Sequence, residues 1–152
     1  MRFGPCGGSG VDRNALADGL RGWDMSDQRT PSAAESLCFE AGIKFGTLYH
    51  QFAGTPISPA SARSLAIAME QAIENQPHCR AVTVEIREAE LERAIADGAA
   101  DYVELTGRFL EVEIVVEDGD LEVVTRMEME DGYPLMQVDA IRDGSADDRD
   151  GR

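Results

Sequence analysis

Residues 109–141 decide the fold class, and they read FLEVEIVVEDGDLEVVTRMEMEDGYPLMQVDAI. Apolar and polar residues alternate along three runs of this stretch: Phe109–Val116, Leu121–Met129 and Tyr133–Ile141. A period of two is typical of strands that bury one face. Asp-Gly pairs at 118–119 and 131–132 separate the runs and favour tight hairpins. The C-terminal half is therefore predicted to be a meander of about three antiparallel strands.

Two helices are predicted ahead of this meander. In residues 35–52 apolar residues recur mainly every three or four positions, which favours a helix despite two interior glycines. Ser58 and Pro59 then supply an N-cap and a first-turn proline for a second helix that ends near Pro77. The apolar positions are Leu37, Phe39, Ala41, Phe45, Leu48 and Phe52 in the first helix and Ala62, Leu65, Ala66, Met69, Ala72 and Ile73 in the second.

A further strand and a short helix complete the pattern. Ala81–Ile86 alternates as a strand, and Glu88–Ala96 fits an acidic helix closed by Gly98. Helices that cover one face of a mainly antiparallel sheet define an α+β domain, which is the fold class expected here.

The length of 152 residues and the hydrophobic share of 43% suit one core, so a single domain is expected at residues 35–142. Residues 1–34 are predicted to be a disordered extension, in which Met25 is an alternative start. Residues 143–152, with four aspartates, are predicted to be a disordered acidic tail.

The net charge of the chain limits the kinds of partner that it can bind. The 29 acidic and 14 basic residues give a net charge of -15, which repels nucleic-acid phosphates and anionic lipid. We therefore expect no nucleic acid and no membrane as partner. Of the basic residues 13 are arginine and only Lys44 is lysine. A lysine-poor acidic surface is typical of a halophile cytoplasm, where salt screens the self-repulsion.

The cysteines indicate a reduced protein without a structural metal. Cys6, Cys38 and Cys79 are odd in number, and together with His50 and His78 they show no zinc-type spacing. No run approaches the roughly 18 apolar residues of a membrane span, and the glycine-rich start has no signal-peptide core. A cytoplasmic location is expected.

The segment Phe39–Pro56 sets a carboxylate, the only lysine, an imidazole and a phenol among apolar residues. Such groups need a partner when buried. Glu40 has two interpretations. It forms a helical ion pair with Lys44 four residues on, or it anchors a ligand. A carboxylate accepts two parallel hydrogen bonds from a heterocycle with an exocyclic amine beside a ring N–H, as in guanine and pterins.

His50, near the end of the same helix, is either a structural residue at the helix C-terminus or a functional one. Ten helical residues would separate it from Glu40 by about 15 Å of rise and about 80° of rotation. Both residues then cannot hold one small ring. Either the glycines break the helix, or the site is shared between subunits.

Two further polar residues have an ordinary structural interpretation. Tyr133 opens the last predicted strand, where a tyrosine is usually a half-buried aromatic. Gln76 is by default a polar residue at a helix end. The spacing of these two residues alone gives no reason to assign either of them a functional role.

Four motif blocks together resemble the archaeal dihydroneopterin aldolases of tetrahydromethanopterin and folate-type pterin synthesis. They are Glu40-Ala41-Gly42-Ile43-Lys44, Tyr49-His50-Gln51-Phe52, Gly54-Thr55-Pro56 and Tyr133-Pro134-Leu135-Met136. The resemblance runs from about Leu37 to Ile141. It implies cleavage of 7,8-dihydroneopterin into 6-hydroxymethyl-7,8-dihydropterin and glycolaldehyde, without a cofactor, by an α+β homo-oligomer that we expect to be a tetramer.

The resemblance also implies roles for single residues. Glu40 would bind the substrate, and His50 would bind it and share in catalysis. Tyr133 and Gln76 would transfer protons, directly or through a water, with Gln71 as the alternative to Gln76. A different function for the same residues is a non-catalytic pterin- or purine-binding homo-oligomer, which would keep Glu40 but release no glycolaldehyde.

Overall fold

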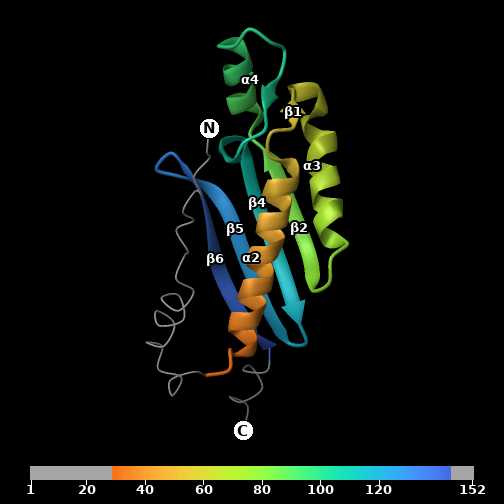
Figure 1. Ribbon diagram of the computed structural model, residues 1–152, viewed down its shortest axis with the longest axis vertical. Helices are drawn as coiled ribbons and strands as arrows, with labels where there is room; N and C mark the ends of the chain where they lie inside the picture. The colour runs from red at the N-terminus through yellow and green to blue at the C-terminus, as the bar shows by residue number, and fades with distance from the viewer. Residues whose placement is uncertain (1–28, 145–152) are drawn as a thin grey trace, which may run out of the picture. The chain divides into compact units, whose positions relative to one another are not determined.

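The computed structural model describes residues 29–144 (Figure 1). The chain divides at Thr30 into two units, and the fold belongs to the second of them, Pro31–Arg152. The disorder expected for the N-terminal extension and the acidic tail concerns mostly residues 1–28 and 145–152, which lie outside the described residues.

A four-stranded antiparallel sheet forms one layer, with the strand order β2-β4-β5-β6. The strands are β2 (Cys79–Ile86), β4 (Leu110–Asp118), β5 (Leu121–Glu130) and β6 (Tyr133–Asp143). Between β5 and β6, Asp131 and Gly132 have φ values of 49° and 83°, as a two-residue hairpin with the right-handed strand twist requires. The predicted meander is confirmed.

Helices α2 (Ala33–Phe52) and α3 (Pro59–Glu74) form the second layer, and α4 (Glu88–Ala96) follows β2. Figure 1 shows α2 crossing the face of β4 and β5, while α3 runs along β2. The predicted α+β architecture is confirmed. Within residues 29–144 no helix has both the length and the hydropathy that crossing a membrane takes.

The core lies between the two layers. Helix α2 is continuous because its buried residues form one unbroken stripe along it. Leu37, Ala41, Phe45 and Leu48 are all buried and recur at three- and four-residue spacing. Phe39 was expected in this stripe, but it is 73% exposed because it lies off that spacing. Packing against the sheet therefore holds the helix through both of its glycines.

Helix α3 also covers one edge of the sheet. The Glu70 carboxylate accepts a hydrogen bond from the backbone N–H of Val84 (2.9 Å), and Glu74 accepts one from Val82 (3.3 Å). These donors belong to β2, which pairs only with β4 among the described strands. The edge at β2 is thereby covered along its middle, since the outward N–H groups of Val82 and Val84 have partners.

A second, two-stranded sheet was not predicted. Strand β1 (Pro56–Ile57) pairs with β3 (Val103–Glu104), and the 3₁₀ turn η2 (Gly107–Phe109) leads into β4. Two residues are too few to show an alternation, so periodicity could not reveal these strands. The motif block Gly54-Thr55-Pro56 leads into this small sheet.

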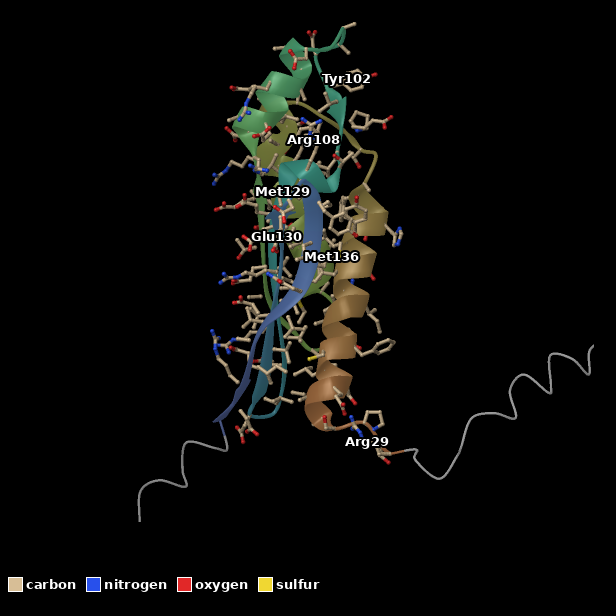
Figure 2. The ribbon with its side chains drawn as sticks, turned by 90° about the vertical axis from the view of Figure 1, so that its left-hand side faces the viewer. Arg29, Tyr102, Arg108, Met129, Glu130 and Met136 are labelled. Carbon is tan, nitrogen blue, oxygen red and sulfur yellow. The ribbon has the colours of Figure 1, made fainter. Side chains whose placement is uncertain are left out.

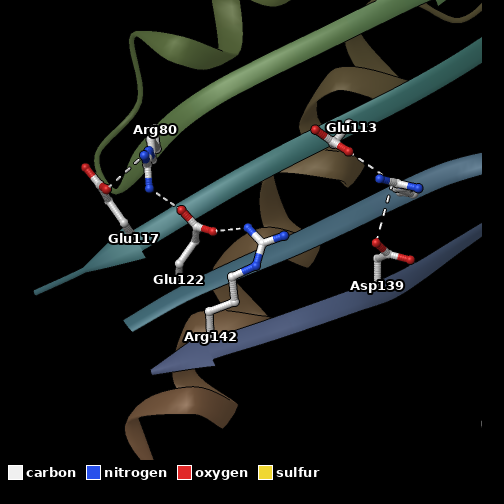
Figure 3. A network of polar contacts seen from close by, with 7 residues as sticks. Arg80, Glu113, Glu117, Glu122, Asp139 and Arg142 are labelled. Carbon is white, nitrogen blue, oxygen red and sulfur yellow. Dashed lines mark hydrogen bonds and ion pairs between the residues drawn. The ribbon is translucent and has the colours of Figure 1, made fainter. Parts of the chain in front are cut away.

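The sheet face away from the helices is charged. Ion pairs join its strands as follows: Arg80 with Glu117 and Glu122, Arg142 with Glu122, and Arg126 with Glu113 and Asp139 (Figure 3). Exposed pairs of this kind contribute about 0–1 kcal/mol each and weaken further in salt. The stability of the fold therefore comes mainly from the apolar helix side.

Candidate active site

An ion pair on α2 forms the first part of the site. The Lys44 Nζ donates to the Glu40 Oε1 at 2.6 Å, so the i, i+4 pair expected from the sequence is present. Its depth was not anticipated: Lys44 is fully buried, while the Glu40 side chain keeps 33% of its surface exposed. Glu40 is thus a half-buried carboxylate rather than a buried one, because the lysine occupies the interior position.

The environment of Glu40 favours its ionised form. The hydrogen bond from Lys44 and the charge of Lys44 lower the pKa of this carboxyl from 4.5 against the opposing effect of partial burial, and His78 adds to the lowering in its protonated form. Glu40 is therefore a carboxylate at neutral pH, and its exposed part is available as a hydrogen-bond acceptor.

This shift predicts a pH dependence of stability. A carboxyl whose pKa is lower in the folded state stabilises the fold above its unfolded pKa and loses that contribution as pH falls through the folded pKa. We expect the advantage of the wild type over Glu40→Gln, measured by urea unfolding, to be constant above about pH 5.5 and to shrink below the reference value of 4.5. An advantage already lost at pH 6 would contradict the assigned direction.

Glu40 opens into a small cavity at the N-terminal half of α2. The cavity has a volume of about 170 Å³ and is lined by Ser36, Leu37, Glu40, His78 and Asp118. Gln76 lies two residues before His78 in a tight turn, in which its carbonyl accepts from the N–H of Cys79 at 3.3 Å. The structure thus brings Gln76 to the Glu40 end of the molecule, whereas the alternative Gln71 lies on the exposed surface of α3.

His50 and Tyr133 lie toward the opposite end of α2. His50 is exposed in the last turn of the helix, and its ring meets that of Tyr49 edge to face at 6.3 Å. Tyr133 opens β6 and is 65% exposed. Their neighbours Tyr49 and Pro134 both pack near Gly107, so two motif blocks distant in sequence meet there.

This meeting point depends on a glycine. A Cβ on Gly107 would lie 2.7 Å from the Cβ and Cγ of Pro134 and 3.3 Å from the Tyr49 Cε2. We expect Gly107→Ala to lower the free energy of unfolding by about 1–3 kcal/mol through overpacking, as measured by urea denaturation. Gly46→Ala is the matched control, because nothing lies within 4 Å of its added Cβ. It should stabilise the helix by about 0.5–1 kcal/mol. Equal stability of Gly107→Ala and wild type would show that the contact is not tight.

The candidate residues of one chain therefore lie at two ends of the molecule, Glu40 and Gln76 at one and His50 and Tyr133 at the other, and Gln76 is not among the residues that line the Glu40 cavity. Helix α2 is unbroken between Glu40 and His50, so the possibility that its glycines break it is wrong. Asp118, in the wall of the Glu40 cavity, and Tyr133 lie at opposite ends of β5. At about 3.4 Å per residue they are roughly 30 Å apart along the sheet. One pterin ring cannot touch both groups of a single chain.

Sequence reasoning missed His78 and Asp118 as cavity residues. Asp118 belongs to a hairpin that was identified only for its turn geometry. His78 was considered only as a metal ligand. The only indication of its position in the sequence is the preceding Pro77. Proline is common at the second position of a tight turn, and in a type II turn the third position then has a positive φ.

An apolar groove separates α2 from β6. It has a volume of about 190 Å³ and is lined by Cys38, Gly42, Phe45, Thr125, Met136, Gln137 and Val138. Figure 2 shows Met136 between the strand and the helix. Two large apolar side chains that line the groove, Met136 and Val138, are exposed, and three more are exposed elsewhere on the same helix and strand: Phe39, Ile43 and Ile141. Exposed apolar surface of this extent is typical of an interaction site.

Comparison with known proteins shows first the fold of the chain and then its family. A crystal structure of a protein from Picrophilus torridus has the same α+β fold, with a TM-score of 0.62 and 24% identity over 72% of this chain and 89% of that one. The family model for dihydroneopterin aldolase matches residues 32–139. The chain belongs to the dihydroneopterin aldolase family, among its archaeal members.

Two relatives bear the same description. The dihydroneopterin aldolase of Methanopyrus kandleri is 41% identical over 113 residues, which are 73% of this chain and 91% of the relative. That of Picrophilus torridus is 27% identical over 105 residues, 68% of this chain and 84% of the relative. The matched region contains the folded part from α2 into β6.

Proposed function

We propose that this chain is a dihydroneopterin aldolase that cleaves 7,8-dihydroneopterin into 6-hydroxymethyl-7,8-dihydropterin and glycolaldehyde. The observation that supports this best is the partly exposed Glu40 carboxylate, which Lys44 keeps ionised in the wall of a small cavity. It supplies the acceptor pair that the amine and ring N–H of a pterin need.

The reaction is a retro-aldol cleavage. A base removes the proton from the hydroxyl on the second side-chain carbon, and the bond between the first and second side-chain carbons breaks. The two outer carbons leave as glycolaldehyde. The electron pair moves into the imine of the dihydropterin ring, and a proton delivered to the first side-chain carbon then restores the imine. The ring accepts the electrons, so the protein has only to bind the substrate and move protons, and we propose no cofactor.

The proposed binding and proton-transfer roles belong to residues at opposite ends of α2. Glu40 holds the amidine edge of the ring, and Gln76 lies at the same end. Tyr133, with its phenol exposed, is the proposed proton-transfer group, acting with Gln76 directly or through a water. His50 orients the side-chain hydroxyls or shares the role of base.

Lys44 is a poor candidate for a Schiff base. It is the only lysine of the chain, it is fully buried, and its Nζ donates to Glu40 at 2.6 Å. An amine that attacks a carbonyl must reach the substrate with a free lone pair. Borohydride added during turnover should therefore trap no substrate on Lys44, and recovery of the substrate mass on that residue would refute this mechanism.

We propose that each site is shared between two subunits of a homo-oligomer, expected to be a tetramer. The cavity at Glu40, about 170 Å³, is smaller than the roughly 300 Å³ at which complete ligand pockets begin. A single chain also keeps Tyr133 at the far end of the sheet. A second copy that contributes Tyr133 and His50 would complete the pocket.

The surface available for that second copy is the α2/β6 side. Among residues 29–144 no strand pairs with the outer edge of β6, whereas α3 covers the edge at β2 along its middle. The exposed apolar side chains of Met136 and Val138, which line the groove, lie on the same side. A second copy docked there would bury them, which is the main favourable term in most protein association.

Incubation of the purified chain with 7,8-dihydroneopterin in molar KCl tests the reaction. Release of glycolaldehyde in equal amount to 6-hydroxymethyl-7,8-dihydropterin, in the presence of a chelator, is the expected result. Pterin binding without glycolaldehyde would instead identify a non-catalytic pterin-binding protein.

A further inference from the structure

A histidine occupies the third position of the turn that follows α3, where a glycine is normally found. The carbonyl of Gln76 accepts from the N–H of Cys79, Pro77 is second in the turn, and His78 has a φ of 62°. A proline followed by a positive φ defines a type II turn, in which the third position favours glycine or asparagine. Histidine adopts this left-handed conformation less readily than glycine, so the backbone here carries some strain, and such strain is found most often at functional sites.

Glu117 on β4 holds this histidine in place. The N–H of Glu117 donates to the His78 carbonyl at 2.9 Å, and the His78 Nδ1 lies 3.3 Å from the Glu117 carbonyl oxygen. A carbonyl only accepts, so the ring proton is on Nδ1. In the neutral imidazole the Nε2 therefore carries the lone pair and is an acceptor.

His78 lines the same cavity as Glu40 and Asp118. The carboxyl side chains of Glu40 and Asp118 and the ring of His78 line this cavity, so hydrogen-bond acceptors predominate in its wall when the ring proton is on Nδ1, and the cavity suits a group rich in donors. The amidine edge of a pterin has three hydrogens, one on the ring nitrogen and two on the exocyclic amine. Two parallel bonds to Glu40 leave one amine hydrogen without a partner.

We propose that His78 is a further substrate-binding residue, whose Nε2 accepts the amine hydrogen that Glu40 leaves free and thereby selects a 2-amino ring over a 2-oxo ring of the same shape. This inference rests on the proposed pterin site. The proposed role gives a reason for the strained turn. Glycine would fit the backbone better, but it has no side chain to accept a hydrogen bond from the amine.

Two ligands and two variants test the assignment at pH 7 in molar KCl. Pterin and lumazine share one bicyclic ring, but lumazine has an oxygen where pterin has the amine. His78→Asn tolerates the positive φ and lacks a group at the place of Nε2, and His78→Gly relieves the strain and removes the ring. Binding is measured by quenching of ligand fluorescence, and folding by thermal unfolding.

Both variants should melt at the wild-type temperature or up to about 5 °C above it, because they suit the turn. Their Kd for pterin should rise about 3- to 10-fold, the effect of one lost hydrogen bond. Their Kd for lumazine should stay within about 2-fold of wild type, so the preference for pterin falls. Stability and affinity thus move independently, which a purely structural histidine would not produce.

Three results would overturn the inference about His78. The first is an unchanged preference for pterin in both variants, and the second is a wild type that binds pterin and lumazine equally well. The third is a melting temperature lowered by more than about 10 °C, which would make the histidine structural. In each case pterin binding by the wild type leaves the proposed function standing. A wild type that binds no pterin and releases no glycolaldehyde would refute the proposed function itself.

Discussion

Tyr133→Phe should lower kcat for glycolaldehyde release by about 10²- to 10⁴-fold and leave pterin binding nearly unchanged, since it removes only the proposed proton-transfer group. The phenylalanine keeps the ring and all of its packing. Tyr133 is 65% exposed, so the fold does not depend on the hydroxyl. The loss should therefore appear in kcat, with KM within about 3-fold of wild type.

Tyr102→Phe provides the matched control. Tyr102 is similarly exposed, at 54%, and lies outside the four motif blocks. Its variant should be as active as wild type in the same assay. A Tyr133→Phe enzyme with unchanged kcat would remove Tyr133 from the chemistry, whatever the effect on binding.

Glu40→Gln should raise the Kd for pterin on the order of 100-fold, because the two proposed charge-assisted hydrogen bonds become at best one neutral acceptor contact. The single variant has a second effect, since it leaves the buried Lys44 without its counter-charge. Breaking a fully buried pair costs about 3–5 kcal/mol of stability. A third of Glu40 is in solvent, so about 2 kcal/mol is the expected loss here.

The double variant Glu40→Gln/Lys44→Met separates binding from folding. Removing both charges restores stability, since an apolar side chain in the place of a buried ion is often neutral or better. Pterin binding should stay as weak as in the single variant. Lys44→Met alone keeps the carboxylate and should retain binding. Wild-type affinity in the stable double variant would contradict the role given to Glu40.

Patterns along the sequence predicted the elements that are long enough to show a period. Three alternating runs became β4, β5 and β6, and Ser58-Pro59 marked the start of α3. The pairing of β1 with β3 was not predictable, because two residues show no alternation. The polar residues of the apolar segment Phe39–Pro56 drew attention to Glu40 and His50, whereas the family resemblance alone predicted roles for Gln76 and Tyr133.

The sequence did not reveal which side chains are buried or which residues have a positive φ. Spacing placed Glu40 and Lys44 on one side of a helix but could not tell which of them is buried, since both have long side chains with a charged end. The cavity position of His78 depends on a positive φ and on Glu117, which is 39 residues away. Contacts between distant parts of the chain decide such features, and a single sequence does not encode them locally.

Mixing two inactive variants tests the shared site most directly. Glu40→Gln/Lys44→Met and Tyr133→Phe subunits are each expected to be nearly inactive alone. After unfolding together in equal amounts and refolding, random assembly should give about a quarter of the sites an intact residue from each of two subunits. We predict that about a quarter of the wild-type rate of glycolaldehyde release returns. A refolded mixture that is no more active than its two components would contradict a site built from two chains.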